Sequence, residues 1–112
     1  MAAAAGRNLK KTVLELGGSD PYILLADADM DLAVEIALRG RLVNSGQSCI
    51  AAKRFVAVKE VKAEFEKRFT EQMKLATYGD PMDDASKIGP MARHDLRDQL
   101  HAQVLESITK GA

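Results

Sequence analysis

The sequence predicts an α/β fold in which parallel-type strands are flanked by helices. Two short apolar runs, residues 22–26 and 55–58, lack the alternation that marks a strand with one wet face, which is typical of strands covered on both faces in a parallel sheet. The longer stretches 30–43 and 61–76 carry apolar residues at helical spacing. Strands that alternate with helices in this way indicate α/β architecture.

The first segments are predicted to be the end of a helix and a strand. Residues 2–5 are alanines that precede Gly6, a residue suited to a helix C-cap, so they are interpreted as the last turns of a helix. Residues 12–16, Thr-Val-Leu-Glu-Leu, are β-prone and stop at two glycines, which predicts a strand that enters a turn.

Residues 30–43 predict a mostly buried helix, for which Asp29 is a suitable N-cap. Apolar residues occupy most of the helix surface and leave only a narrow polar stripe, formed by Asp31, Glu35 and Arg39. Because Glu35 precedes Arg39 by about one turn, we expect an ion pair worth ~0.3–0.5 kcal/mol between them.

The second half of the chain predicts one more buried strand, at residues 55–58, and two amphipathic helices. The first helix, which extends to about residue 76, is predicted from apolar residues at every fourth position: Val61, Phe65, Phe69 and Met73. The second is predicted from the same spacing at Leu96, Leu100, Val104 and Ile108, and Lys110-Gly111 closes it.

Composition excludes several classes of protein. Hydrophobic residues make up 46% of the chain and charged residues 29%, as in an ordinary globular domain. Sixteen basic residues balance sixteen acidic ones without a basic stripe, so no nucleic-acid partner is predicted. No apolar run approaches the length of a membrane span. Together with a single cysteine and no secretory signal, these features predict a cytoplasmic location.

No metal site is predicted, because no Cys/His cluster has the spacing of zinc ligands. The two histidines, His94 and His101, lie seven residues apart on the last predicted helix and are interpreted as solvated or capping residues.

The chemistry-bearing candidates are Cys49 and Glu15. Cys49 follows Gly46, Gln47 and Ser48, and a thiol flanked by glycine and small polar residues suggests a nucleophile on an accessible turn. Its alternative interpretation is a small buried hydrophobic residue, as many lone cysteines are. Glu15 ends an apolar run before two glycines, which suggests a carboxylate beside a backbone that another group can approach closely. The alternative interpretation of Glu15 is a solvated side chain.

The two segments together resemble the aldehyde dehydrogenase superfamily, which carries a Glu-Leu-Gly-Gly motif and a Gly-Gln-x-Cys motif in this order. The resemblance implies that Cys49 is the nucleophile and Glu15 the general base. It implies that the carbonyl of Leu16 holds the nicotinamide amide of NAD or NADP and that Gly17 lets the cofactor approach. Ser48 and Ile50 would line the aldehyde pocket.

The resemblance extends over nearly the whole chain, and residues 47–55 look most like bacterial succinate-semialdehyde dehydrogenases. It implies that residues 1–17 are the C-terminal tail of a cofactor-binding domain and that residues 18–112 are the N-terminal part of a catalytic domain. We therefore expect an internal fragment of a larger enzyme that has a small aldehyde as its substrate. In this fragment, the side chains of Glu15 and Cys49 are expected to meet across a cleft.

The fragment is also expected to associate into a homo-oligomer, because its apolar strand and helix would otherwise remain uncovered. The rival hypothesis is a noncatalytic interaction or assembly module in which Cys49 is buried and chemically idle.

Overall fold

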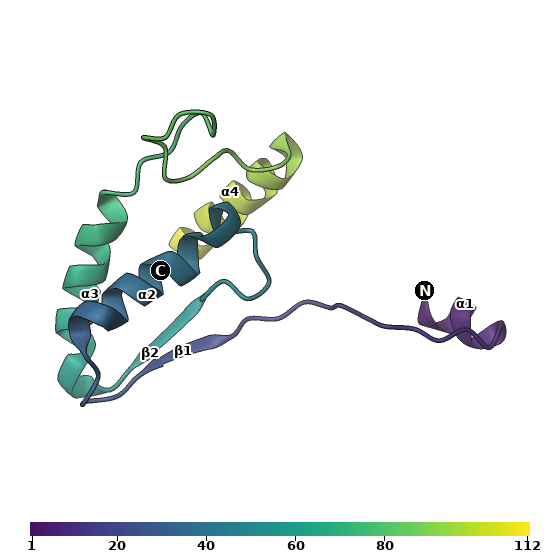
Figure 1. Cartoon of the computed structure of the whole chain (residues 1–112), viewed down its shortest axis with the longest axis horizontal. Coiled ribbons are helices and arrows are strands. Elements are labelled where there is room, and N and C mark those ends of the chain that lie inside the picture. The colour runs from purple at the N-terminus through teal and green to yellow at the C-terminus, as the bar shows by residue number, and fades with distance from the viewer.

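The computed structural model describes all residues from 1 to 112 and confirms the α/β class. Its helices and strands are α1 (Ala2–Arg7), β1 (Pro21–Leu24), α2 (Met30–Leu42), the short 3-10 helix η1 (Val43–Gly46), β2 (Arg54–Ala57), α3 (Lys59–Lys74) and α4 (His94–Thr109). Strands β1 and β2 pair in parallel, from Pro21 with Arg54 to Leu24 with Ala57. Because parallel neighbours need a crossover, the chain passes through α2 between them (Figure 1).

The core lies where α2 and α3 pack against the strands. Its buried members come from β1, α2 and α3: Leu24, Ala33, Val34, Ala37 and Phe65. Three phenylalanines continue this core from β2 into α3, with ring centroids 5.7 Å apart for Phe55 and Phe65 and 4.8 Å apart for Phe55 and Phe69. Aromatic contacts of this kind hold the helix on the strand that precedes it.

The strands are covered on one face only, which corrects the expectation that both faces are buried. Leu24 is 1% exposed, whereas its neighbour Ile23 is 63% exposed, and Val56 of β2 is 53% exposed. Successive side chains of a strand point to opposite faces of the sheet, so an apolar run buries every second residue when helices cover a single face.

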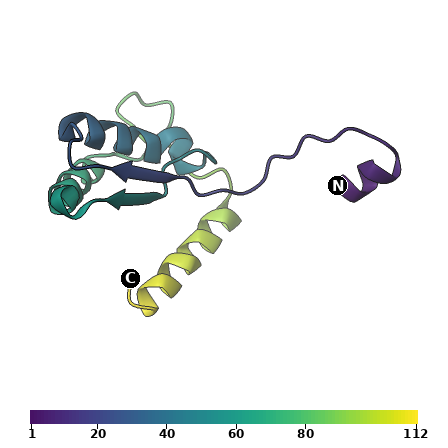
Figure 2. The same ribbon diagram turned by 90° about the horizontal axis from the view of Figure 1, so that it is seen from below.

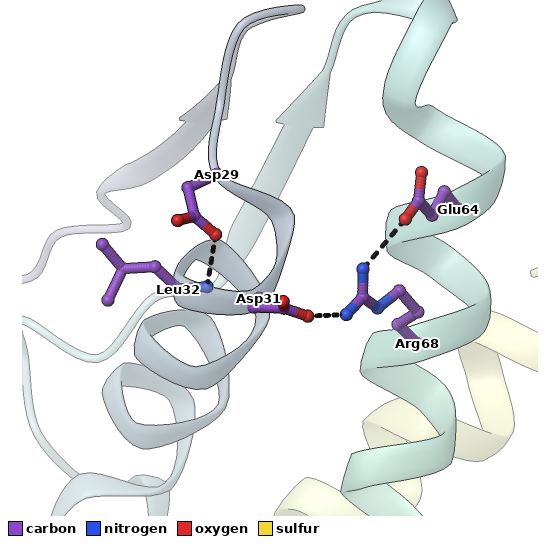
Figure 3. Close-up of polar contacts among 5 residues, drawn as sticks. All are labelled: Asp29, Asp31, Leu32, Glu64 and Arg68. Atoms are coloured by element: carbon purple, nitrogen blue, oxygen red, sulfur yellow. Dashed lines mark hydrogen bonds and ion pairs between the residues drawn. The ribbon is translucent and has the colours of Figure 1, made fainter.

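Helix α2 begins as expected, because the carboxylate of Asp29 accepts a hydrogen bond from the N–H of Leu32 at 3.1 Å (Figure 3). The expected burial is wrong: Leu32 and Ile36 are about half exposed, and the buried residues are confined to Ala33, Val34 and Ala37. The α3 helix covers one flank of α2 and strand β1 contacts it at the core, whereas Leu32 and Ile36 remain partly exposed to solvent.

The expected ion pair between Glu35 and Arg39 does not form. The ion pairs on this part of the surface instead join Asp31 to Arg68 of α3, and Arg68 to Glu64 at 2.9 Å (Figure 3). The hydrogen bond that Arg68 donates to Glu64 is the main cause that raises the pKa of Arg68, with a further contribution from Asp31. These charges link α2 to α3 at the rim of the core.

The N-terminal segment differs from expectation at two points. Residues 12–16 form no strand, because no neighbouring strand lies beside them to complete a ladder. Helix α1 runs through Gly6 to Arg7, and Asn8 occupies the C-cap position. The arm that carries both features extends away from the rest of the molecule (Figure 1).

The C-terminal helix α4 has no buried residue. Figure 2 shows it projecting from the body that β1, α2, β2 and α3 form. The apolar residues that predicted this helix are all 39–59% exposed: Leu96, Leu100, Val104 and Ile108. None of the helices is long and apolar enough to span a membrane.

Candidate active site

Cys49 lies in the turn between η1 and β2, here named the Cys49 turn (residues 46–52). Cys49 is exposed, so its interpretation as a buried hydrophobic residue is wrong. Ser48 beside it is half-buried. Ile50 is 71% exposed and lines a shallow hollow of about 340 Å³ together with Ile36, Arg39, Gly40 and Val43.

The backbone leading into the Cys49 turn adopts a conformation that L-residues rarely take. Asn44, Ser45 and Gly46 have φ values of 51°, 55° and 75°, so three consecutive residues are left-handed. Such a conformation costs of order 1–3 kcal/mol at a non-glycine residue and persists only where the surroundings impose it. Asn tolerates it best, and glycine has no Cβ to oppose it.

Side-chain hydrogen bonds impose this path from the loop that follows α3. The hydroxyl of Ser45 accepts a bond from the N–H of Gly89 at 3.1 Å, and the Oε1 atom of Gln47 accepts one from the N–H of Ala92 at 3.1 Å. Residues more than forty positions apart are thereby joined. The polar side chains of Ser45 and Gln47 thus attach the Cys49 turn to the loop that follows α3.

Arg41 is a residue that the sequence reasoning missed, and it braces both ends of the turn. Its Nη2 donates to the carbonyl of Gly46 at 2.6 Å, and its Nη1 donates to the carbonyl of Ala52 at 2.8 Å. Ala52 is also tied to α2 by a backbone hydrogen bond to the Gly40 carbonyl at 3.3 Å. The available signal was a basic residue in the last turn of a helix that stops just before the cysteine.

Glu15 lies on the extended arm, and every residue from 11 to 20 is exposed. The carbonyl of Leu16 accepts no hydrogen bond within the chain, and a Cβ placed on Gly17 would meet nothing within 4 Å. The roles implied for Leu16 and Gly17 at the nicotinamide therefore stay predictions.

Two basic side chains donate to the Glu15 segment (residues 11–20), and one of them, Lys53, also donates to the Cys49 turn. The Nζ atom of Lys53 donates to the carbonyls of Gly18 and Cys49, each at 3.1 Å. Arg54 donates to the carbonyl of Ser19 from Nε at 3.1 Å and from Nη2 at 2.8 Å. None of the five main surface hollows is lined by Glu15 or Cys49, so a cleft shared by their side chains stays a prediction.

No group of three or more His, Cys, Asp or Glu side chains gathers where a metal ion could bind. His94 and His101 are both exposed on α4.

The sequence model of the aldehyde dehydrogenase family matches residues 1–112, which is the whole chain. The chain belongs to the aldehyde dehydrogenase family. Within this family, it is 51% identical over its whole length to a succinate semialdehyde dehydrogenase [NAD(P)+] of Escherichia coli K12, of which it covers 24%. It is 48% identical, with the same coverage, to a succinate-semialdehyde dehydrogenase [NADP(+)] of Mycobacterium ulcerans.

Solved aldehyde dehydrogenases share the fold of this segment. Aldehyde dehydrogenase C of Pseudomonas syringae, solved as a cysteine-to-alanine variant with NAD+ and octanal, superposes with a TM-score of 0.91 at 32% identity. The match covers 99% of this chain and 23% of that enzyme. The chain thus spans about a quarter of the length of the aldehyde dehydrogenases that it matches.

Proposed function

We propose that this chain is the segment of an NAD(P)-dependent aldehyde dehydrogenase that carries the nucleophile Cys49 and the general base Glu15. The observation that supports this proposal most is the double hydrogen bond of Lys53, which joins the Cys49 turn to the residues that follow Glu15. Two motifs that are distant in the sequence are thereby held side by side, as a shared reaction requires.

In the proposed reaction, the thiolate of Cys49 attacks the aldehyde carbon and forms a carbon–sulfur bond. The electron pair of the carbonyl moves to its oxygen, which the backbone N–H of Cys49 would stabilise by donating a hydrogen bond. Bound NAD or NADP supplies the acceptor for the hydride that leaves this carbon. As the hydride leaves, the electron pair on the oxygen would re-form the carbonyl, so that Cys49 carries a thioester.

Hydrolysis would complete the cycle. Glu15 would accept a proton from a water molecule as the oxygen of that water attacks the thioester carbon. The carbon–sulfur bond breaks, the carboxylic acid leaves, and the thiolate of Cys49 is regenerated. An exposed cysteine on a braced turn suits this role, because the nucleophile must reach the substrate without moving away from its donors.

Leu16 and Gly17 are proposed to contact the cofactor, and Ser48 and Ile50 the aldehyde. The free carbonyl of Leu16 can accept a bond from the nicotinamide amide, and the open side of Gly17 leaves room for the ring. The hollow beside Ile50 is lined partly by apolar side chains, which suits the carbon chain of an aldehyde. Succinate semialdehyde is the proposed substrate, because both curated relatives bear that name.

The proposal includes the organisation of the protein. Residues 1–17 would be the tail of a cofactor-binding domain, and residues 18–112 the first part of the catalytic domain. This division agrees with the arm that separates from the body near β1 (Figure 1). The exposed apolar residues of α2 and α4 favour association into a homo-oligomer, and the single cysteine favours a reducing compartment such as the cytoplasm.

The test is a pair of assays on the full polypeptide that contains residues 1–112. NADH or NADPH formation with succinate semialdehyde and hydrolysis of a nitrophenyl ester are compared for wild type, Cys49→Ser and Glu15→Gln. We expect Cys49→Ser to abolish both activities and Glu15→Gln to slow the release of the acyl group. Ester turnover that is unchanged in Cys49→Ser would remove this residue from the chemistry and favour the assembly-module hypothesis.

A further inference from the structure

We propose that Lys53 is a positioning residue that sets the distance between the general base and the nucleophile, an inference that rests on the proposed function. Its ammonium donates to one carbonyl in each motif, that of Gly18 and that of Cys49, both at 3.1 Å. Lys53 is the only side chain that forms hydrogen bonds to both the Glu15 segment and the Cys49 turn.

The Glu15 segment depends on very few contacts. Residues 11–20 take part in no backbone hydrogen bond outside the helices and strands, and their carbonyls accept three side-chain bonds, one from Lys53 and two from Arg54. The bonds of Arg54 end at Ser19 and do not extend to the turn. Loss of Lys53 would therefore leave the residues around Gly18 unattached on the side that faces Cys49.

The Cys49 turn, by contrast, has a second support. Arg41 holds the carbonyls of Gly46 and Ala52 on either side of Cys49, independently of Lys53. Removal of the Lys53 ammonium should thus disturb the position of Glu15 relative to Cys49 more than the turn itself. Lysine suits the task because its ammonium has three donors, and the two carbonyls use only two of them.

This asymmetry predicts which chemical step suffers. Acylation of Cys49 by an activated ester needs the turn but not the general base. Release of the acyl group needs a water molecule within hydrogen-bond reach of Glu15, and a displacement of about 1 Å can cost roughly 100-fold in rate. We expect Lys53→Met to slow deacylation by about 10- to 100-fold and to change the acylation rate by less than about 3-fold.

The experiment uses the full polypeptide and burst kinetics with nitrophenyl acetate, which resolve acylation from steady-state deacylation. Lys53→Arg should restore most of the deacylation rate, because a guanidinium can donate to two carbonyls. The matched control is Lys67→Met, an exposed lysine of α3 without a polar partner, which should behave as wild type. Equal losses in both steps, or no loss in deacylation, would overturn the proposal.

Failure of the proposed function is a separate result: Cys49→Ser and Glu15→Gln would then leave ester turnover intact, whatever the Lys53 variants show.

Discussion

Replacement of Arg41 by methionine tests how the Cys49 turn is held. Methionine keeps an unbranched apolar stem but removes both donors to the carbonyls of Gly46 and Ala52. Ala52 is buried, 9% exposed, so water can replace the lost bond at its carbonyl only by local opening. The turn should therefore loosen at both ends while the body of α2 remains folded.

The size of the effect follows from these contacts. A hydrogen bond from a charged donor contributes about 1.5–3 kcal/mol, and the half-buried position of Arg41 favours the lower end for each of the two bonds. Relaxation of the left-handed residues Asn44 and Ser45 would return about 1 kcal/mol. We expect the free energy of unfolding to fall by about 2 kcal/mol.

The assay is urea unfolding followed by far-ultraviolet circular dichroism on the full polypeptide, for wild type and Arg41→Met. The control is Arg39→Met, because Arg39 is an exposed arginine on the same helix without a polar partner. The urea midpoint of Arg39→Met should equal that of wild type within the error of the measurement. The midpoint of Arg41→Met should fall by about 1 M, given the usual dependence of the unfolding free energy on urea concentration. Equal midpoints for the two variants would refute the reasoning that one guanidinium braces the turn.

Three further predictions follow from the same structure. Gly46→Ala should lower the free energy of unfolding by at least about 1–2 kcal/mol in thermal unfolding, because φ is +75° and the new Cβ would lie 2.8 Å from the guanidinium of Arg41. The control Gly6→Ala should cause no loss, because its new Cβ meets nothing within 4 Å. Phe65→Ala should cost about 3–5 kcal/mol, since the side chain is 4% exposed in the core, and a loss below 1 kcal/mol in urea unfolding would contradict its place there. Burial raises the pKa of Tyr22, so the neutral phenol is favoured in the fold: stability should hold below the ordinary tyrosine pKa of about 10 and fall as the pH rises beyond it. Tyr22→Phe should lose the bond to the Ala33 carbonyl and this alkaline loss of stability together, as a pH series of urea midpoints would show.

The sequence by itself determined the elements whose signals are local. Asp29 predicts where α2 begins because its carboxylate can bond only to N–H groups one turn ahead, and the structure places that bond at Leu32. The four-residue spacing of Phe65 and Phe69 predicts a helix face for the same kind of reason, since 3.6 residues complete one turn. The motifs around Glu15 and Cys49 were likewise sufficient to indicate the family that the whole-chain match confirms.

Only the tertiary structure decided the properties that depend on a partner distant in sequence. Residues 12–16 have strand propensity but no neighbouring strand, so their backbone forms no ladder. The exposure of Ile23 and Val56 depends on which sheet face the helices cover, which an apolar run cannot specify. The support of the Cys49 turn arises in the same way, because Arg41 and Lys53 act on carbonyls, and every residue type offers the same carbonyl.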